Sequence, residues 1–129
     1  MLDQRHTLDF KRRLHERATQ LREEVQETLA RSSEESHAQV AERVRDNEDD
    51  SFATLIVDTN LAEVDRDVVE LRLIDSALQR LSSGTYGICT NCEQAIPMAR
   101  LEAEPTAVRC IQCQELYEKT HASAGTPSL

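Results

Sequence analysis

The chain has little of what builds a large compact core. Its 129 residues include no Trp, only two Tyr and two Phe, three Gly and three Pro, so that aromatic residues make up 3%. Because Gly and Pro are the residues that break helices, their scarcity favours long helices over a strand-rich fold. We expect one elongated all-α domain rather than a broad globule.

Positive charge and long hydrophobic runs are also scarce. The 15 Lys and Arg residues face 24 Asp and Glu residues, which gives a net charge of −9 and a pI near 4.9. Proteins that bind nucleic acid need a basic face, so this balance disfavours direct DNA binding and favours a positively charged protein partner. The sequence shows neither the apolar segment of a signal peptide nor a membrane span, so we expect a cytoplasmic protein.

Two long stretches carry apolar residues at alternating spacings of three and four, which is typical of coiled-coil helices. The first, residues 9–44, is expected to be helical throughout, with weaker pairing where "RSSEES" (31–36) interrupts the apolar stripe. The second, residues 57–81, stops before Gly84, a residue suited to the position after a helix. The acidic segment "DNEDDS" (46–51) separates the two stretches.

The two stretches bury their apolar stripes most simply by folding back on each other. We therefore predict a long antiparallel coiled-coil hairpin within residues 1–84, with the acidic segment 46–51 at its far tip. A single unbroken helix that pairs with a second chain is the alternative, since no Gly or Pro forces the turn. A zinc-finger base (85–122) with a C-terminal helix (111–122) and a flexible tail (123–129) completes the expected domain, which we expect to be monomeric.

All four cysteines lie in one short stretch as two matched pairs. Two residues separate Cys89 from Cys92 and Cys110 from Cys113, and 17 residues separate the pairs. In a cytoplasmic protein such pairs more often bind metal than form disulfides, and four thiolates can surround one tetrahedral Zn²⁺ at about 2.3 Å. We predict one structural zinc ion in a zinc ribbon, because four thiolates leave no open position for catalysis. Zinc release on oxidation is the alternative role of this cluster.

The stretch "YGICTNCEQAIPMARLEAEPTAVRCIQCQ" resembles the signature of the DksA/TraR family of bacterial transcription regulators. Residues 10–25 resemble the start of the family's first long helix, and residues 73–87 resemble the end of its second. The resemblance implies a hairpin that projects from a zinc-containing base and enters the secondary channel of RNA polymerase. It implies no sequence-specific contact with DNA.

The resemblance also assigns roles to individual residues. Asp46, Asp49 and Ser51 match the family's tip motif, in which Ala usually stands at the last position, and Asp50 is the alternative to Asp49 if the register differs. Arg66 matches an arginine that docks against the polymerase. Acidic residues at a helix start also cap free N–H groups, so charge by itself does not require a function at the tip.

One departure from the family concerns the alarmone guanosine tetraphosphate, which many members hold partly through basic residues. Leu73, Glu104 and Gln114 stand at three of those basic positions. A carboxylate at Glu104 would repel phosphate, so we predict weak or absent alarmone binding.

The leading hypothesis is a non-enzymatic modulator of RNA polymerase whose tip carboxylates act near the catalytic magnesium ion. The alternative is a zinc-dependent, redox-responsive stress or adaptor protein that acts on another protein partner. An enzyme is disfavoured, because the four histidines are scattered and the sequence has neither a Gly-rich phosphate loop nor a nucleophile motif.

Overall fold

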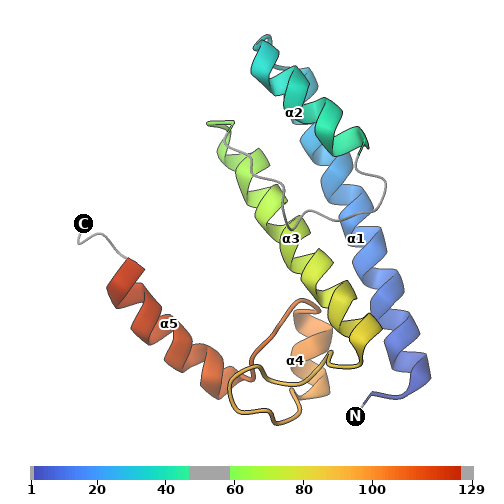
Figure 1. The fold of residues 1–129 in the computed structure, drawn as a ribbon, viewed down its shortest axis with the longest axis vertical. Coiled ribbons are helices and arrows are strands. Elements are labelled where there is room, and N and C mark those ends of the chain that lie inside the picture. The colour runs from blue at the N-terminus through green and yellow to red at the C-terminus, as the bar shows by residue number, and fades with distance from the viewer. Residues whose placement is uncertain (1, 47–58, 126–129) are drawn as a thin grey trace.

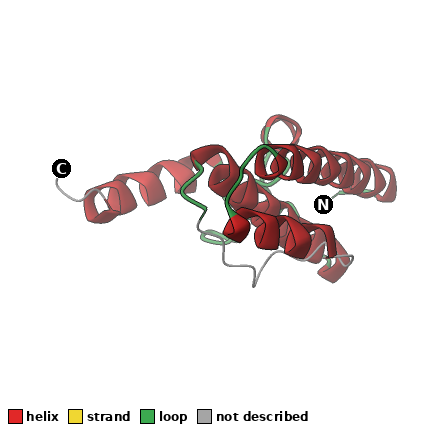
Figure 2. Ribbon diagram, turned by 90° about the horizontal axis from the view of Figure 1, so that it is seen from above, coloured by secondary structure: helices red, strands yellow, loops and turns green. Residues whose placement is uncertain are grey.

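The structure is a computed structural model that describes residues 2–46 and 59–125. The described residues are helical apart from the connections, of which 84–97 is the longest (Figure 2), and one isolated antiparallel bridge links Ile88 to Ala95. None of their helices combines the length and apolar character that a membrane span requires. The predicted all-α class is confirmed by helices α1 (Gln4–Ala30), α2 (Glu35–Asp46), α3 (Ala62–Ser83), α4 (Met98–Ala103) and α5 (Ile111–Gly125).

Helices α1 and α3 lie side by side and run in opposite directions along the long axis of the molecule (Figure 1). Both bury one residue every three or four positions, as the sequence pattern predicted. Full burial of such an apolar side chain contributes about 1.5–3 kcal/mol. The hairpin prediction is therefore confirmed, with a seam formed by Phe10, Leu14, Ala18, Leu21, Val25 and Leu29 of α1 and by Val64, Val68, Leu71, Ile74 and Ala77 of α3.

The ends of this helix pair are set by local backbone chemistry. α1 begins at Gln4, five residues before the predicted start, because the Asp3 carboxylate accepts a hydrogen bond of 2.8 Å from the His6 backbone N–H. This hydrogen bond holds the pKa of Asp3 below its ordinary value. At the end of α3, Gly84 has φ 82°, a left-handed conformation that costs Gly little, so its predicted role as a helix stop is confirmed.

The prediction of one continuous helix over residues 9–44 is wrong. Helices α1 and α2 are separated by the connection 31–34, where the chain reverses and α2 runs back beside α1 (Figure 1). The physical reason lies in Ser32, whose hydroxyl accepts a hydrogen bond of 3.1 Å from the Glu34 N–H and also contacts the His37 ring. Such local side-chain bonds compete with the helical backbone pattern and favour a turn.

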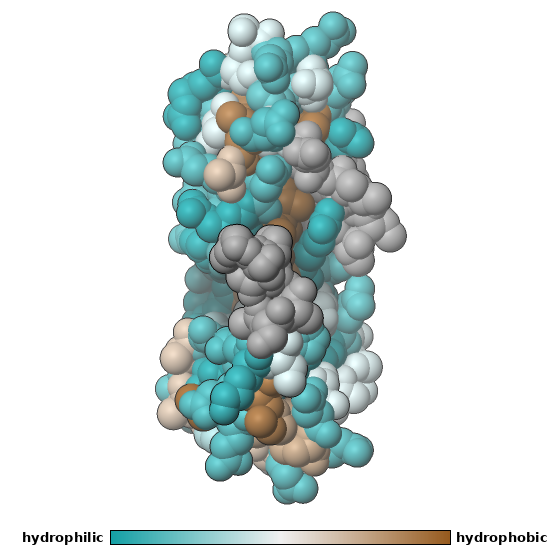
Figure 3. Space-filling view, turned by 90° about the vertical axis from the view of Figure 1, so that its left-hand side faces the viewer, coloured by the Kyte–Doolittle hydropathy of each residue, from teal (hydrophilic) through white to brown (hydrophobic). Residues whose placement is uncertain are grey.

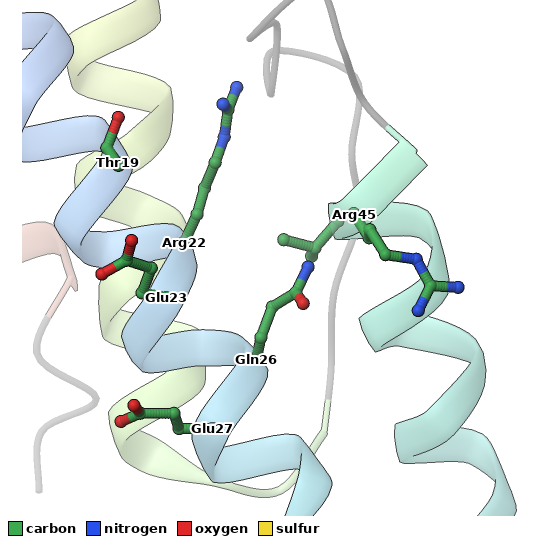
Figure 4. A pocket seen from close by; sticks show the side chains of 7 residues that line it. Thr19, Arg22, Glu23, Gln26, Glu27 and Arg45 are labelled. Carbon is green, nitrogen blue, oxygen red and sulfur yellow. The ribbon is translucent and has the colours of Figure 1, made fainter.

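The reversal changes where the predicted tip begins. The end of α2 lies beside the middle of α1 rather than at the far end of the hairpin (Figure 4). Val44 and Arg45 of α2 line one pocket there with residues of α1, namely Thr19, Arg22, Glu23, Gln26 and Glu27. Asp46, the last residue of α2, therefore does not lie at the far end, contrary to our prediction. Asp49, Asp50 and Ser51 lie outside the described residues, and their roles stay predictions.

A buried histidine holds the far end together. The Nε2 atom of His37 lies 2.8 Å from the Thr59 carbonyl oxygen and 3.0 Å from the Glu34 carboxylate, and its Nδ1 atom contacts the Ser32 hydroxyl. The Thr59 N–H and hydroxyl in turn donate to the Asp65 carboxylate on the first turn of α3. His37 thus links the α1–α2 connection to the segment that starts α3.

Charged residues flank the seam between α1 and α3. Arg17 of α1 donates two hydrogen bonds, of 2.7 and 3.0 Å, to the Glu70 carboxylate of α3.

One turn earlier on α3, partial burial raises the pKa of Asp67, and the nearby charge of Glu24 on α1 raises it further. A carboxyl with a raised pKa in the folded state contributes stability only at low pH, and this contribution is lost as the pH rises through that pKa. The Asp67–Glu24 pair therefore costs stability at neutral pH.

We expect Asp67→Asn to stabilise the fold at pH 7 by about 0.5 kcal/mol, a value already reduced for solvent screening of a mostly exposed pair. The substitution removes one of two neighbouring negative charges and keeps a polar side chain. Thermal unfolding of both proteins should show this gain at pH 7 and a smaller gain as the pH is lowered toward 4. Glu63→Gln, at an exposed acid in the first turn of α3, is the control and should not stabilise. An unchanged or lower unfolding temperature of Asp67→Asn at pH 7 would contradict this reading.

Candidate metal centre and its connection to the hairpin

The four predicted cysteine ligands converge at one point in the base. Their Sγ atoms all lie within 4.8 Å of one another, and those of Cys92 and Cys110 are 3.9 Å apart. A tetrahedral Zn²⁺ with four sulfur ligands at about 2.3 Å separates those sulfurs by about 3.8 Å. The cluster therefore fits one zinc ion, and no second group of three or more such ligands occurs within the described part of the chain.

A tight turn shapes the first pair of ligands. The backbone N–H of Cys89 donates to the Gln94 carbonyl at 2.8 Å, and the Cys89 carbonyl accepts from the Glu93 N–H at 2.9 Å. Glu93 has φ 62°, which reverses the chain within this turn. The Cys92 N–H points at the Cys89 sulfur at 3.5 Å, so the turn aims both ligands at the same point.

The second pair lies where the chain enters α5. Cys110 immediately precedes this helix and Cys113 lies in its first turn, and the Gln114 N–H donates to the Cys110 carbonyl at 2.8 Å. The two pairs are joined by a backbone hydrogen bond of 2.9 Å from Thr90 to Val108. The fold thus brings the two cysteine pairs together, so that their four sulfur atoms can surround one metal ion.

The thiols affect one another's ionisation. Burial disfavours the Cys89 thiolate, but N–H groups of Cys92, Cys110 and Asn91 outweigh it and lower the pKa of Cys89 to about 6. Hydrogen bonding to neighbouring thiols, first of all Cys110, raises the pKa of Cys113 to about 12. One thiol therefore ionises readily, while another keeps its proton in hydrogen bonds with its neighbours, so the four groups are not all thiolates by themselves. A divalent cation removes this conflict and lets all four ligate as thiolates.

Two arginines brace the loop between the ligand pairs. Arg100 of α4 donates from Nε to the Arg109 carbonyl at 2.7 Å. Arg109 donates from Nε to the Asn91 side chain at 3.2 Å, and its guanidinium lies 3.7 Å from the Tyr117 ring centroid. Four thiolates and one Zn²⁺ carry a charge of −2, so these neighbouring cations also offset the charge of the centre.

Aromatic packing fixes the base to the near end of the hairpin. The rings of Phe10 on α1 and Tyr86 in the base lie 5.5 Å apart, and the Tyr86 hydroxyl donates to the Pro105 carbonyl at 2.7 Å. Burial raises the pKa of Tyr86 to about 12, so the hydroxyl stays a donor at neutral pH. Arg13 lies over the Phe10 ring and donates to the Glu102 carbonyl at 2.8 Å. Local sequence patterns do not reveal the roles of Tyr86 and Arg13, because their partners lie far away along the chain.

α5 begins at Ile111, as predicted, and continues to Gly125, three residues beyond the predicted end at 122. It leaves the base and extends away from the hairpin (Figures 1 and 2). Viewed from the side on which α5 projects, the surface is mostly hydrophilic with small apolar areas (Figure 3). Ile111 and Leu116 are 55% and 62% exposed. The C-terminal helix therefore joins the base through Cys113 in its first turn and through the contact of Tyr117 with Arg109.

The remaining predicted residues fall in two places. Arg66 is exposed on α3, close to the start of that helix and far from the metal centre. Leu73, Glu104 and Gln114 lie together, because all three line one groove between α3, the end of α4 and α5. The structure thus brings together the three positions at which this chain departs from the family's basic residues. It places Arg66 apart from them.

Removing the metal should unfold the base. Structural zinc sites contribute about 10–16 kcal/mol of binding free energy, which matches or exceeds the stability of a whole small domain. We expect a zinc chelator or Cys113→Ser to abolish the hydrogen-exchange protection of the Thr90 amide, which donates to Val108, and to lower the unfolding temperature. Ser33→Ala, in the exposed connection far from the metal, is the matched control. Retention of Thr90 protection in the metal-free protein would show that the centre is not structural.

Comparisons with known proteins agree with this geometry. The sequence model of the prokaryotic dksA/traR C4-type zinc finger matches residues 84–119, which include all four cysteines. The RNA polymerase-binding transcription factor DksA of Caulobacter vibrioides is 32% identical over 112 residues, which cover 85% of this chain and 74% of that protein. The similarity therefore extends beyond the metal centre into the hairpin.

Two solved structures have a related fold. Transcription factor DksA2 from Pseudomonas aeruginosa matches with a TM-score of 0.62 at 25% identity, over 93% of this chain and 88% of that chain. The RNA polymerase binding protein and transcriptional regulator from Chlamydia trachomatis matches with a TM-score of 0.55 at 27% identity, over 93% and 95% of the two chains. With its four-cysteine zinc site at the base of a helical hairpin, this chain belongs to the DksA/TraR zinc-finger family.

Proposed function

We propose that this protein is a non-enzymatic transcription regulator that binds RNA polymerase directly. The observation that carries the proposal is its similarity to RNA polymerase-binding transcription factor DksA over 85% of the chain, through both the hairpin and the metal centre. The net charge of −9 supports a protein partner rather than direct binding to DNA. The closed shell of four thiolates supports a structural rather than a catalytic metal.

The hairpin is the part that we propose enters the secondary channel of the polymerase. The 27 residues of α1 span about 40 Å at ~1.5 Å per residue, which is long enough to reach well into a channel while the base stays outside. The link between Phe10 and Tyr86 supports this division, because it holds the base at one end of the hairpin. A fixed base would set the angle at which the hairpin enters.

The acidic segment that begins at the end of α2 is the part that we propose alters initiation. In this proposal Asp46 and Asp49, with Asp50 as the alternative in register and Ser51 beside them, place negative charge near the catalytic magnesium ion or its mobile neighbours. α2 runs back along α1, so the segment begins on the side of the hairpin rather than at its outermost end. Arg66, exposed near the start of α3, is proposed to dock on the polymerase by its charge.

We further propose that guanosine tetraphosphate contributes little to this activity. Leu73, Glu104 and Gln114 line one groove, in which Glu104 supplies a carboxylate and the other two supply no charge. Arg100 and Arg109 also line the groove, but each donates to base groups, and Arg100 lies 3.7 Å from Glu104. This charge pattern supports weak binding of a phosphate-rich ligand.

The alternative is a redox-responsive adaptor that acts on another protein. The exposed position of Cys92 favours it, because an accessible zinc-bound thiolate can be reached by an oxidant. That reading requires zinc release and loss of helix under mild peroxide, whereas the regulator proposed above requires neither. Measuring zinc release with a metal-sensitive dye alongside circular dichroism separates the two.

The proposed function is tested by transcription in vitro from a ribosomal promoter with purified polymerase. We expect the wild type to change initiation. Asp46→Asn with Asp49→Asn should lose that effect and still bind polymerase within about twofold, because affinity would come mainly from the arms and base. Glu23→Gln with Glu27→Gln removes the same charge from α1 and serves as the control. A wild-type protein that neither binds polymerase nor changes initiation would contradict the proposal.

The alarmone proposal is tested in the same assay with and without guanosine tetraphosphate. We expect the alarmone to change the wild-type effect by less than about twofold, whereas Glu104→Arg with Gln114→Lys should make the effect alarmone-dependent, because two cations can hold phosphate. Glu102→Arg with Gln112→Lys adds the same charge at neighbouring positions and should leave the response unchanged. Tight alarmone binding by the wild-type complex would contradict the proposal.

A further inference from the structure

The charge of this chain is distributed unevenly. The first 22 residues hold six Lys or Arg against three Asp or Glu, a net charge of +3, so the remaining 107 residues carry −12. This positive segment includes the part of α1 nearest the base, from Gln4 to Arg22. An otherwise acidic protein therefore has one place where a negatively charged partner would be attracted rather than repelled.

One side of α1 in this region carries no acidic residue. Positions three or four apart on a helix share a face, and from the start of α1 to residue 26 one such stripe consists of Gln4, Leu8, Lys11, His15, Thr19, Arg22 and Gln26. Leu8 is 58% exposed and Lys11 is exposed beside it. The stripe therefore combines an apolar side chain with positive charge.

Helix α2 already covers the upper part of this stripe. Its end packs beside Thr19, Arg22 and Gln26 (Figure 4), and the buried face of α2 is formed by His37, Val40 and Val44. α2 ends at Asp46, so Leu8, Lys11 and His15 continue the same stripe beyond it, toward the base. Among the residues that the structure describes, the stripe on which α2 packs is thus prolonged toward the base by a section that no other helix covers.

We propose that this uncovered section, the Leu8–Lys11–His15 surface, is a docking site for an acidic helix of RNA polymerase that presents an apolar side chain to Leu8. The inference rests on the proposed function and names a second contact, on the face of α1 near the base. Charge complementarity selects an acidic partner, because the surface lies in a positive segment of an otherwise acidic chain. Lys11 is the exposed cation on this section of the stripe, whereas the neighbouring Arg12 pairs with Asp9 and Glu16.

The test is the affinity of the labelled full-length protein for purified core RNA polymerase. We expect Leu8→Gln with Lys11→Glu to weaken binding about tenfold at about 0.05 M salt, and expect the loss to shrink at about 0.3 M salt as charges are screened. Both side chains are exposed, so the variant should keep the wild-type unfolding temperature. Lys119→Glu on α5, combined with Leu116→Gln, makes the same chemical changes at exposed positions elsewhere and is the matched control.

The outcomes separate this inference from the proposed function. Loss of affinity in the α1 variant, with near wild-type binding of the α5 control, supports the docking site. Wild-type affinity in the α1 variant, or equal losses in both variants, overturns the docking site and leaves the proposed function standing. A wild type that does not bind polymerase overturns both.

Discussion

The mutual repulsion of four thiolates held within 4.8 Å of one another is the constraint on which the base depends. Such a cluster is stable only around a divalent cation, and the base has few buried side chains of its own to replace it. The cluster orders the turn at Cys89 and the start of α5, while Arg100 closes the loop between the ligand pairs. The contact between Tyr86 and Phe10 connects this ordered base to α1, so the metal also stabilises the position of the hairpin relative to the base.

The hairpin itself needs no metal. Its seam is built from side chains buried at alternating spacings of three and four, and the Arg17–Glu70 pair lies at its edge. Structural roles and proposed functional roles therefore lie on different faces of the same helices. Apolar groups and the metal hold the shape, whereas the proposed contacts with polymerase are made by exposed charges such as Arg66 and Lys11 and by the acidic segment that starts at Asp46.

Features that depend on local sequence could be predicted, and those that depend on distant contacts could not. The seam of the hairpin, the stop at Gly84 and the four zinc ligands follow from periodicity, backbone freedom and ligand spacing, and the structure confirms them. The reversal at 31–34 was missed, because a weak stripe over the serines indicates poor pairing but not a turn. That turn is completed by the contact of His37 with Thr59, 22 residues away, which no local pattern reveals.

In the proposed function, the hairpin carries the end of α2 toward the catalytic centre of the polymerase while the base stays outside. Photo-crosslinking tests it most directly, with benzoylphenylalanine placed at Arg45, which is exposed beside Asp46, or at Lys119 on α5. The account predicts that the probe at Arg45 crosslinks to elements lining the secondary channel and that the probe at Lys119 does not. Crosslinks to the channel from Lys119 but not from Arg45 would contradict it.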